Sequence, residues 1–329
     1  MTTLAAELIT REPELAALRP EWAALHRRAG TSPFQSPEWL LPWWRSFGTG
    51  ELRAAALRSE DGALAGLLPL YVLREAGGAK LLPVGVGVSD FLDALVEPGL
   101  PDAASALLSA ALDGMAGRVS ACDLPDMPPA AHLLAAAVPD GWAGRTGVGT
   151  PCPVLPLAGG LRARAPARML RKWRMAMHRA DRAGGWSVEP ARADTLMPIF
   201  GALVALHGGR WATRGEAGVL ADPDVREFHR AALPGLMQAG LLRLQALRIG
   251  GEIAAVTYAL LGPGRIFFYL SGFDPDRAFE SPGTILLGAM LAEAAAEGRE
   301  QAEFLRGAEA YKYAWGAADR FNHFRRLVS

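Results

Sequence analysis

The sequence has few residues of the kinds that hold metal ions or form disulfides. Its 329 residues include two cysteines, Cys122 and Cys152, which lie in unrelated contexts and form no CxxC motif. Its six histidines are scattered along the chain. We therefore expect neither a disulfide framework nor a structural zinc site, and no metal cofactor.

An excess of one charge and long apolar runs are also missing. Lys plus Arg equals Asp plus Glu at 34 each, which disfavours nucleic acid as a partner but leaves a local basic patch open. The longest apolar stretches, such as TILLGAMLAEAAA, are shorter than the ~20 residues that span a bilayer. The N-terminus carries acids early and lacks an apolar core, unlike a signal peptide. These features favour a cytoplasmic protein.

Several catalytic signatures are absent. The chain contains no GxSxG, no HExxH and no GxxxxGK[ST], which disfavours serine hydrolases, zinc hydrolases and kinases. GVGVSD at 85–90 lacks the third glycine of a dinucleotide-binding loop and leads into an expected strand rather than a helix.

What the sequence does contain is enough apolar residues for two cores. Half of the residues are hydrophobic, and the length exceeds the ~250–300 residues at which a single core stops growing. A shift to Gly, Pro and Thr over 140–166 predicts an inter-domain crossing, so we expect domains at 1–160 and 161–329. After it, apolar periodicity and Gly turns predict the order β-α-α-β-β-β-α-β-α-β, which is typical of a mixed α/β sheet.

The stretch FYLSGFDPDRAFESPGTILLG predicts a strand, a polar loop and a helix that begins at Ser281. Ser281 suits the N-cap and Pro282 the first helical position. The free amides of Gly283, Thr284 and Ile285 would then point outward and form an anion site, with Gly283 letting a phosphate approach. The alternative is an ordinary capped helix.

The stretch RGAEAYKYAWGA follows the next expected strand, so it should emerge at the same sheet edge as that helix start. A phenol or a lysine there could transfer protons or hold a carboxylate or phosphate, which makes Tyr311 and Lys312 candidates for catalysis. Tyr313 and Trp315 are expected to pack beneath them. Packing for the rings and a solvated position for Lys312 are the alternatives.

A basic helix is expected within 162–182, where seven arginines and one lysine face a single acid, Asp181. Such a run commonly forms a solvated face. The alternative is an anionic partner: a phosphorylated substrate, an acyl carrier protein, transfer RNA, or the inner membrane surface in peripheral contact.

The residues together resemble a known group. HGGRWATRGEAG, FYLSGFDPDRAFESPGTILLG, AEFLRGAEAYKYAWGA and the N-terminal EWAALHRRAGTSPFQSPEWLLPWW are similar, in order and spacing, to the CelD-like acetyltransferase group of the GNAT superfamily, which is related to the Fem-type peptidyltransferases. The resemblance implies tandem GNAT-like domains, each a mixed, mainly antiparallel sheet flanked by helices. It also implies a degenerate N-terminal copy on the acceptor side and a C-terminal copy with the acyl-donor site.

The resemblance further implies roles for particular residues. Strand 268–273 would hold the pantetheine of acetyl-CoA or a longer acyl-CoA, and 281–284 its pyrophosphate. The usual [QR]xxGx[GA] phosphate loop is absent, and Gly283 with its neighbours stands in for it. The site residues implied are, for the donor, Phe273, Ser281, Gly283 and Thr284; for the acceptor, Asp90, Arg210 and Glu309, with Lys312; and for protonation of the thiolate, Tyr311, with Tyr313 as its substitute.

The function implied is transfer of an acyl group from an acyl-CoA-type thioester to an amine or hydroxyl, on a small molecule, a glycan such as a polysaccharide precursor, or a lipid amine such as a sphingoid base. Two alternatives stay open. One is a Fem-like transferase that uses aminoacyl-tRNA, supported by the basic helix. The other is a non-catalytic scaffold in a polymer-synthesis complex, supported by the missing phosphate-loop consensus.

Overall fold

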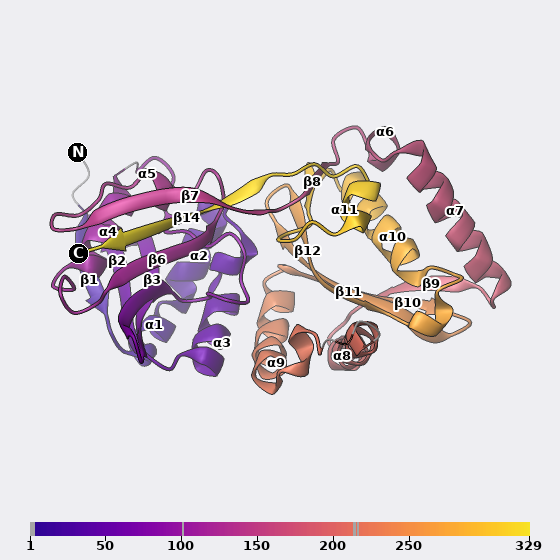
Figure 1. Ribbon diagram of the computed structural model, residues 1–329, viewed down its shortest axis with the longest axis horizontal. Helices are drawn as coiled ribbons and strands as arrows, with labels where there is room; N and C mark the ends of the chain where they lie inside the picture. Colours follow the sequence, from indigo (N-terminus) through magenta and orange to yellow (C-terminus); the bar gives the residue numbers. More distant parts are fainter. Residues whose placement is uncertain (1–3, 101, 213–214, 216) are drawn as a thin grey trace. The chain divides into compact units, whose positions relative to one another are not determined.

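A computed structural model describes residues 4–100, 102–212, 215 and 217–329. The chain forms two compact units (Figure 1). The first contains residues 1–150 and 321–329, and the second contains residues 151–320. The last nine residues were expected in the second domain, but they form a strand of the first sheet, where they pair with a strand centred near residue 124. The expected boundary near residue 160 also moves to residue 150.

The first unit is built on an eight-stranded sheet in the order β1-β2-β3-β4-β6-β14-β7, with β5 paired to β3. Its strands are β1 (Ala5–Ile9), β2 (Glu51–Arg58), β3 (Leu64–Glu75), β4 (Gly78–Pro83), β5 (Leu95–Val96), β6 (Ala121–Met127), β7 (Ala143–Pro151) and β14 (Phe321–Val328). Its helices are α1 (Glu12–Ala17), α2 (Arg19–Ala29), α3 (Pro37–Phe47), α4 (Ala103–Leu112) and α5 (His132–Ala135).

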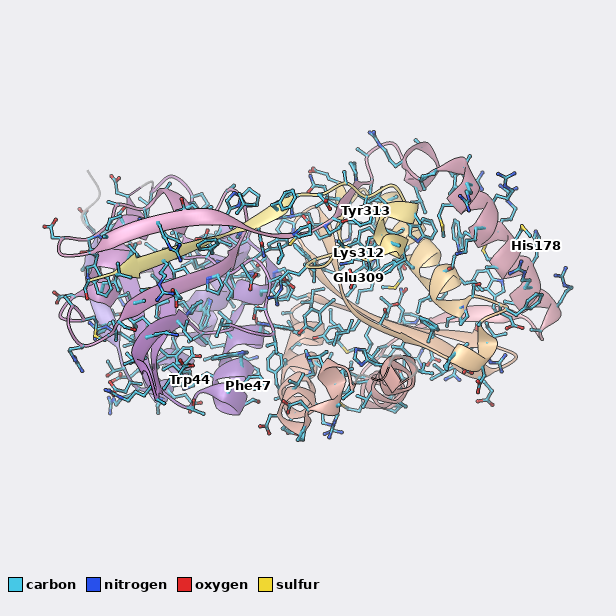
Figure 2. The ribbon with its side chains drawn as sticks, in the orientation of Figure 1. Trp44, Phe47, His178, Glu309, Lys312 and Tyr313 are labelled. Atoms are coloured by element: carbon cyan, nitrogen blue, oxygen red, sulfur yellow. The ribbon has the colours of Figure 1, made fainter. Side chains whose placement is uncertain are left out.

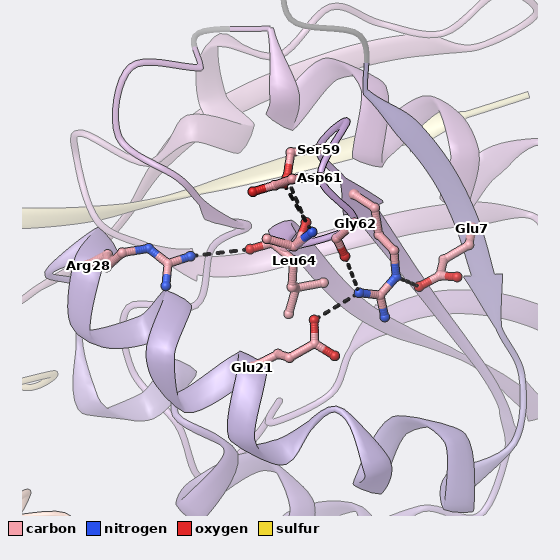
Figure 3. Close-up of polar contacts among 9 residues, drawn as sticks. Glu7, Glu21, Arg28, Ser59, Asp61, Gly62 and Leu64 are labelled. Atoms are coloured by element: carbon pink, nitrogen blue, oxygen red, sulfur yellow. Dashed lines mark hydrogen bonds and ion pairs between the residues drawn. The ribbon is translucent and has the colours of Figure 1, made fainter.

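The turn between β2 and β3 is the one that Asp61-Gly62 predicts. Gly62 has a φ of +82° and donates its N–H to the Ser59 carbonyl at 2.9 Å. Arg58 stabilises this corner, because its guanidinium donates to the carbonyl of Gly62 and to the carboxylates of Glu7 and Glu21 at 2.8–2.9 Å. Figure 3 shows Gly62, Glu7 and Glu21 joined by dashed lines to one guanidinium. The turn is thereby tied to β1 and α2.

The second unit is built on a six-stranded sheet in the order β8-β13-β12-β11-β10-β9. Its strands are β8 (Val154–Pro156), β9 (Trp186–Pro190), β10 (Leu242–Ile249), β11 (Glu252–Gly262), β12 (Arg265–Phe273) and β13 (Gln301–Glu303). Its helices are α6 (Leu161–Arg164), α7 (Ala167–Arg182), α8 (Leu196–Ala212), α9 (Pro223–Gln238), α10 (Pro282–Ala296) and α11 (Ala310–Ala314). The α7 and α10 helices cover one face of the sheet, and α8 and α9 cover the other (Figure 1).

The two units repeat one plan. In the first, antiparallel β2, β3 and β4 lead through α4 to β6, which pairs parallel with β4. In the second, antiparallel β10, β11 and β12 lead through α10 to β13, which pairs parallel with β12. The predicted fold class, tandem mixed and mainly antiparallel sheets flanked by helices, is confirmed.

The composition shift over 140–166 was expected to mark an inter-domain crossing, and the division between the units after residue 150 lies within it. The structure places β7 and β8 in this range. Small residues in β7 serve pairing with β14: a Cβ on Gly149 would lie 2.3 Å from the side-chain oxygen of Asn322, and one on Gly147 2.4 Å from the Phe324 ring. Glycine in this segment therefore permits close approach of side chains from the neighbouring strand.

One glycine fixes the distance between β12 and α8. A Cβ on Gly272 would lie 2.6 Å from the backbone nitrogen of His207, and backbone cannot move aside as a flexible side chain can. We expect Gly272→Ala to destabilise the fold by about 1–3 kcal/mol in urea unfolding. Gly201→Ala in α8 is the matched control, since a Cβ there meets nothing within 4 Å. Equal unfolding midpoints for the two variants would contradict this account.

Candidate functional site

The candidate site is a cavity of about 480 Å³ within the second unit, a volume in the range of small-molecule sites. Its walls come from β12, the loop after it, the start of α10, and α11, with one flank of α7. The lining is mainly apolar and aromatic, and a few hydroxyls, one carboxylate and one ammonium are set into it. The side chains that carry a hydroxyl, a carboxylate or an ammonium are those of Lys172, Thr257, Tyr269, Ser271, Ser281, Thr284, Glu309 and Tyr311.

An open strand edge forms one wall. Strand β12 spans Arg265–Phe273, but its parallel pairing with β13 covers only Arg265 to Phe267. Beyond Glu303 the chain turns to another partner, because the N–H of Phe304 donates to the Pro153 carbonyl at 2.9 Å. The edge of 268–273 therefore diverges from β13. All residues of 268–273 line the cavity, so this extended segment forms a wall along which an elongated ligand would lie.

The start of α10 forms the adjacent wall. Ser281 occupies the N-cap position and Pro282 the first turn, as predicted. The predicted set of free amides is wrong in part, because the N–H groups of Thr284 and Ile285 both donate to the Ser281 carbonyl, at 2.9 and 3.2 Å. Ser281 has left-handed backbone angles and its hydroxyl donates to the Ala278 carbonyl, so it makes no side-chain cap. Among the described residues, the N–H of Gly283 remains without a backbone acceptor at this helix start.

Phe273 and Gly283 meet where these two walls join. A Cβ on Gly283 would lie 3.3 Å from the Phe273 ring, so a larger residue would narrow the cavity at this corner. Lys172, from α7, lines the same cavity and is exposed. Its ammonium and the positive end of the α10 dipole both favour an anionic group in the cavity.

The α11 helix forms the opposite wall, and it contributes Glu309 and Tyr311. The Tyr311 ring is 41% exposed and packs edge-on against Phe304, with ring centroids 6.2 Å apart. Trp315 is buried and contacts Trp173 at 6.0 Å, which anchors α11 to α7. The phenol of Tyr311 is thus held at the wall, with its ring supported from one side.

Lys312 has a different environment from the one predicted. It is 2% exposed and is not among the residues lining the cavity. Its ammonium donates to the carbonyls of Leu305, Arg306 and Gly307 at 3.3, 2.9 and 3.0 Å, and pairs with Glu309 at 2.8 Å. Lys312 and Glu309 are labelled in Figure 2. The ammonium is therefore hydrogen-bonded and ion-paired within its own loop. The expected contact between Lys312 and an anionic group of the acceptor does not fit this geometry.

The same ammonium explains an unusual backbone conformation. Leu305 has a φ of +58°, which is rare for a residue with a branched side chain. The bend turns the carbonyls of the loop inward, toward the Lys312 ammonium. Lys312 therefore positions the loop that carries Glu309, and the Lys312–Glu309 pair sets the carboxylate at the cavity wall.

Tyr313, the expected substitute for Tyr311, is also engaged elsewhere. Its hydroxyl donates to the Asp319 carboxylate at 2.6 Å, and this hydrogen bond raises the pKa of Tyr313 to about 12. It does not line the cavity. A phenol that already donates its proton to a carboxylate is poorly suited to protonate a thiolate.

The nine predicted site residues divide into two groups. The cavity brings together six of them: Phe273, Ser281, Gly283, Thr284, Glu309 and Tyr311. It does not include Lys312, nor Asp90, which is buried in the first unit. The side chain of Arg210 lies outside the described residues.

Two of the polar residues that line the cavity, Thr257 and Lys172, were not in the site predicted from the sequence. Thr257 is a polar residue in the otherwise apolar strand GEIAAVTYAL, and that contrast is the signal that could have found it. Lys172 was not singled out because it lies in a run of arginines, 162–182, that was interpreted as one basic helix. Its position on the flank of α7 next to Met169, which also lines the cavity, distinguishes it from them.

A buried aromatic cluster lies behind Tyr269, another cavity residue. His229 packs against the rings of Phe228, Tyr258 and Tyr269 at centroid distances of 4.7, 5.5 and 5.5 Å. Burial disfavours the charged imidazolium and lowers the pKa of His229 to about 3. The imidazole is therefore neutral at neutral pH.

This burial predicts a pH dependence of stability. Because the folded pKa of His229 lies below its unfolded value of ~6.5, its favourable contribution is complete above that pH and is lost as the pH falls toward 3. We expect the free energy of unfolding of wild type to fall by about 2 kcal/mol between pH 7 and 5 because of His229. In His229→Gln this part of the pH dependence should be absent. Urea unfolding at several pH values measures it, with exposed His178→Gln as the control. Identical slopes for wild type and His229→Gln would refute the assignment.

Comparison with protein families gives one match. Residues 167–313, which run from the start of α7 into α11 and include all the residues that line the cavity except Ala314 and Trp315, match the model of the acetyltransferase (GNAT) domain. Residues 167–313 form a GNAT acetyltransferase domain. Among curated proteins, none matches the sequence.

Solved structures share the fold over the full chain. FemX has 13% identity and a TM-score of 0.66, with 97% of this chain and 96% of that chain covered. L-PGS from Bacillus licheniformis has 14% identity and a TM-score of 0.60, with 96% and 92% covered. The C-terminal domain of an Agrobacterium fabrum protein described as a lysylphosphatidylglycerol synthetase has 14% identity and a TM-score of 0.59, with 97% and 92% covered. Each of these structures therefore shares the fold of nearly the whole chain, across both units.

Proposed function

We propose that the GNAT domain transfers an acyl group from a CoA-type thioester to an amine or hydroxyl acceptor, as in the CelD-like group. The observation that carries the proposal is the divergent edge of β12 beside the start of α10, both lining one cavity. A pantetheine chain is elongated, and 268–273 form an extended wall along which it would lie. The pyrophosphate would lie at Gly283, in the cavity that Lys172 also lines.

The reaction follows from the groups on the opposite wall. The acceptor nitrogen or oxygen attacks the thioester carbonyl carbon, and a new C–N or C–O bond forms. N–H groups of the open β12 edge stabilise the oxyanion that develops on the carbonyl. The C–S bond then breaks, and the Tyr311 phenol protonates the leaving thiolate. Glu309, which lies on the same wall as Tyr311, binds the acceptor ammonium or takes its proton.

Calorimetry with CoA, acetyl-CoA and a long-chain acyl-CoA tests the donor site. We expect wild type to bind at least one of these, and Gly283→Leu to weaken binding at least about tenfold, because its side chain would occupy the corner beside Phe273. Gly201→Leu is the matched control, since nothing lies within 4 Å of a Cβ there. Wild-type protein that binds no donor at all would instead favour a non-catalytic scaffold.

A second candidate is aminoacyl transfer from transfer RNA, which the exposed cations of α7 favour. Filter binding of transfer RNA over a salt series separates the two functions. A transfer-RNA enzyme should bind tightly with a steep dependence on salt, and Arg168→Gln should reduce the slope of log K against log salt by about 1. Weak binding of transfer RNA together with tight binding of acyl-CoA would exclude this candidate.

A further inference from the structure

The outward face of α7 carries charge that the rest of the described protein does not neutralise. Arg168, Arg171 and Arg182 are exposed, and none of them takes part in an ion pair or hydrogen bond among the described residues. The same holds for Lys172 on the adjoining flank. The three arginines span about 21 Å along the helix at 1.5 Å per residue. Packing does not explain this face, because α7 is held to α10 by its opposite side.

That opposite side is the one that packs. Met169, Ala176 and Ala180 are buried at helical spacing, and the Trp173 indole donates to the Ile285 carbonyl of α10 at 3.2 Å. Gly288 of α10 accommodates the indole, since a Cβ there would lie 2.5 Å from it. The helix is therefore fixed in rotation, and its arginines are constrained to point away from the sheet.

Two apolar side chains project among these cations. Met175, midway between Arg168 and Arg182, is 49% exposed. Phe279, in the loop before α10, is 68% exposed. Arg179 holds Phe279 beside α7, because its guanidinium lies 4.7 Å from the ring centroid and donates to the Phe279 carbonyl at 3.0 Å. We define the α7 face as Arg168, Arg171, Met175, Arg179, Arg182 and Phe279.

We propose that the α7 face docks on an anionic lipid bilayer. Cations at a helix surface with protruding apolar side chains between them match the layered chemistry of a membrane interface, where phosphates lie above acyl chains. A nucleic acid would also match the charge. However, the aliphatic Met175 in the middle of the face presents no ring for a base to stack on and would lie against phosphates. A bilayer accepts both the arginines and the two apolar side chains.

Docking in this way has a consequence for the cavity. Lys172 and Met169 line the cavity from the flank of the same helix, and Ala278 and Ser281 line it from the loop that carries Phe279. The cavity wall and the α7 face are therefore built on shared elements. This step rests on the proposed function: an enzyme so docked would take an acceptor or acyl chain from the membrane.

The test is sedimentation of the full chain with vesicles, which requires no donor and no activity. We expect binding to phosphatidylcholine vesicles that contain phosphatidylglycerol, weaker binding at high salt, and little binding to phosphatidylcholine alone. The triple variant Arg168→Gln, Arg171→Gln, Arg182→Gln should bind about 100-fold more weakly, as expected for three cations at about 1 kcal/mol each. Met175→Ser with Phe279→Ser should weaken binding roughly tenfold without changing net charge.

The matched control is Arg74→Gln, Arg192→Gln, Arg230→Gln, which removes the same charge from exposed arginines elsewhere. It should bind nearly as wild type does, and thermal melts confirm that each variant folds. Failure of wild type to bind anionic vesicles would overturn the proposal, as would an equal loss in the control. Tighter binding to transfer RNA than to vesicles, weakened by the same three α7 substitutions, would identify nucleic acid as the partner instead.

Discussion

The Tyr311→Phe variant is expected to turn over an acyl-CoA about 100-fold more slowly, with a donor affinity within about twofold of wild type, because a positioned general acid contributes about 10²–10⁴. The ring stays in place against Phe304 and only the hydroxyl is lost, so the cavity keeps its shape. Thiol release, with the best acceptor from a panel of primary amines and alcohols, gives kcat, and calorimetry gives the donor affinity.

The control for this variant is Tyr313→Phe, which removes a hydroxyl from the same helix. Since the Tyr313 hydroxyl donates to Asp319 and lies off the cavity wall, we expect its loss to leave kcat close to wild type. Turnover of wild type and of Tyr311→Phe is then measured at a series of pH values. If Tyr311→Phe turns over as fast as wild type at every pH, the phenol is not the proton donor and the thiolate is protonated by another group.

The sequence predicted the second sheet well, because its signals are local. Gly250-Gly251 and Gly262-Pro263-Gly264 separate three apolar runs, and the structure has β10, β11 and β12 between those turns. Ser281-Pro282 marks the beginning of α10, and Gly298 follows its end. Each of these features depends on the backbone preferences of a few neighbouring residues, which a single sequence contains.

Features that depend on distant residues were not predictable in this way. The last strand, β14, pairs with β6 some 200 positions earlier in the chain, and no local pattern in NHFRRLVS indicates which sheet it joins. The amides at the start of α10 were expected to be free because the sequence shows the cap residues but not their backbone angles. Ser281 has left-handed backbone angles, and its carbonyl accepts hydrogen bonds from two of those amides.

The site residues show the same division. Tyr311 and Glu309 lie on the cavity wall because a helix after β13 must emerge near the start of α10, which topology alone predicts. Lys312 lies next to Tyr311 in sequence but on another side of a short helix. Its ammonium donates hydrogen bonds to three carbonyls of the preceding loop. Residue type and chain position indicate where a lysine is, but not what satisfies its charge.

Lys312→Met is expected to lower the free energy of unfolding by about 3 kcal/mol, because the carbonyls of Leu305, Arg306 and Gly307 lose their donor while the side chain stays buried. The ion pair with Glu309 adds little to this figure, since the Glu309 side chain is half exposed. Urea unfolding of the full chain measures the change. The loop should also lose its bend at Leu305, which would move Glu309 and Tyr311 together and lower kcat.

Lys312→Arg is the matched variant, because it keeps the charge and the donors in a bulkier group. We expect it to recover part of the stability and part of kcat, as a residue that positions a loop should. A lysine that binds the acceptor would behave differently: Lys312→Met would then fold as stably as wild type, and the KM for the acceptor would rise while kcat changed little. That outcome would return Lys312 to the acceptor site and would require the loop to open during the reaction.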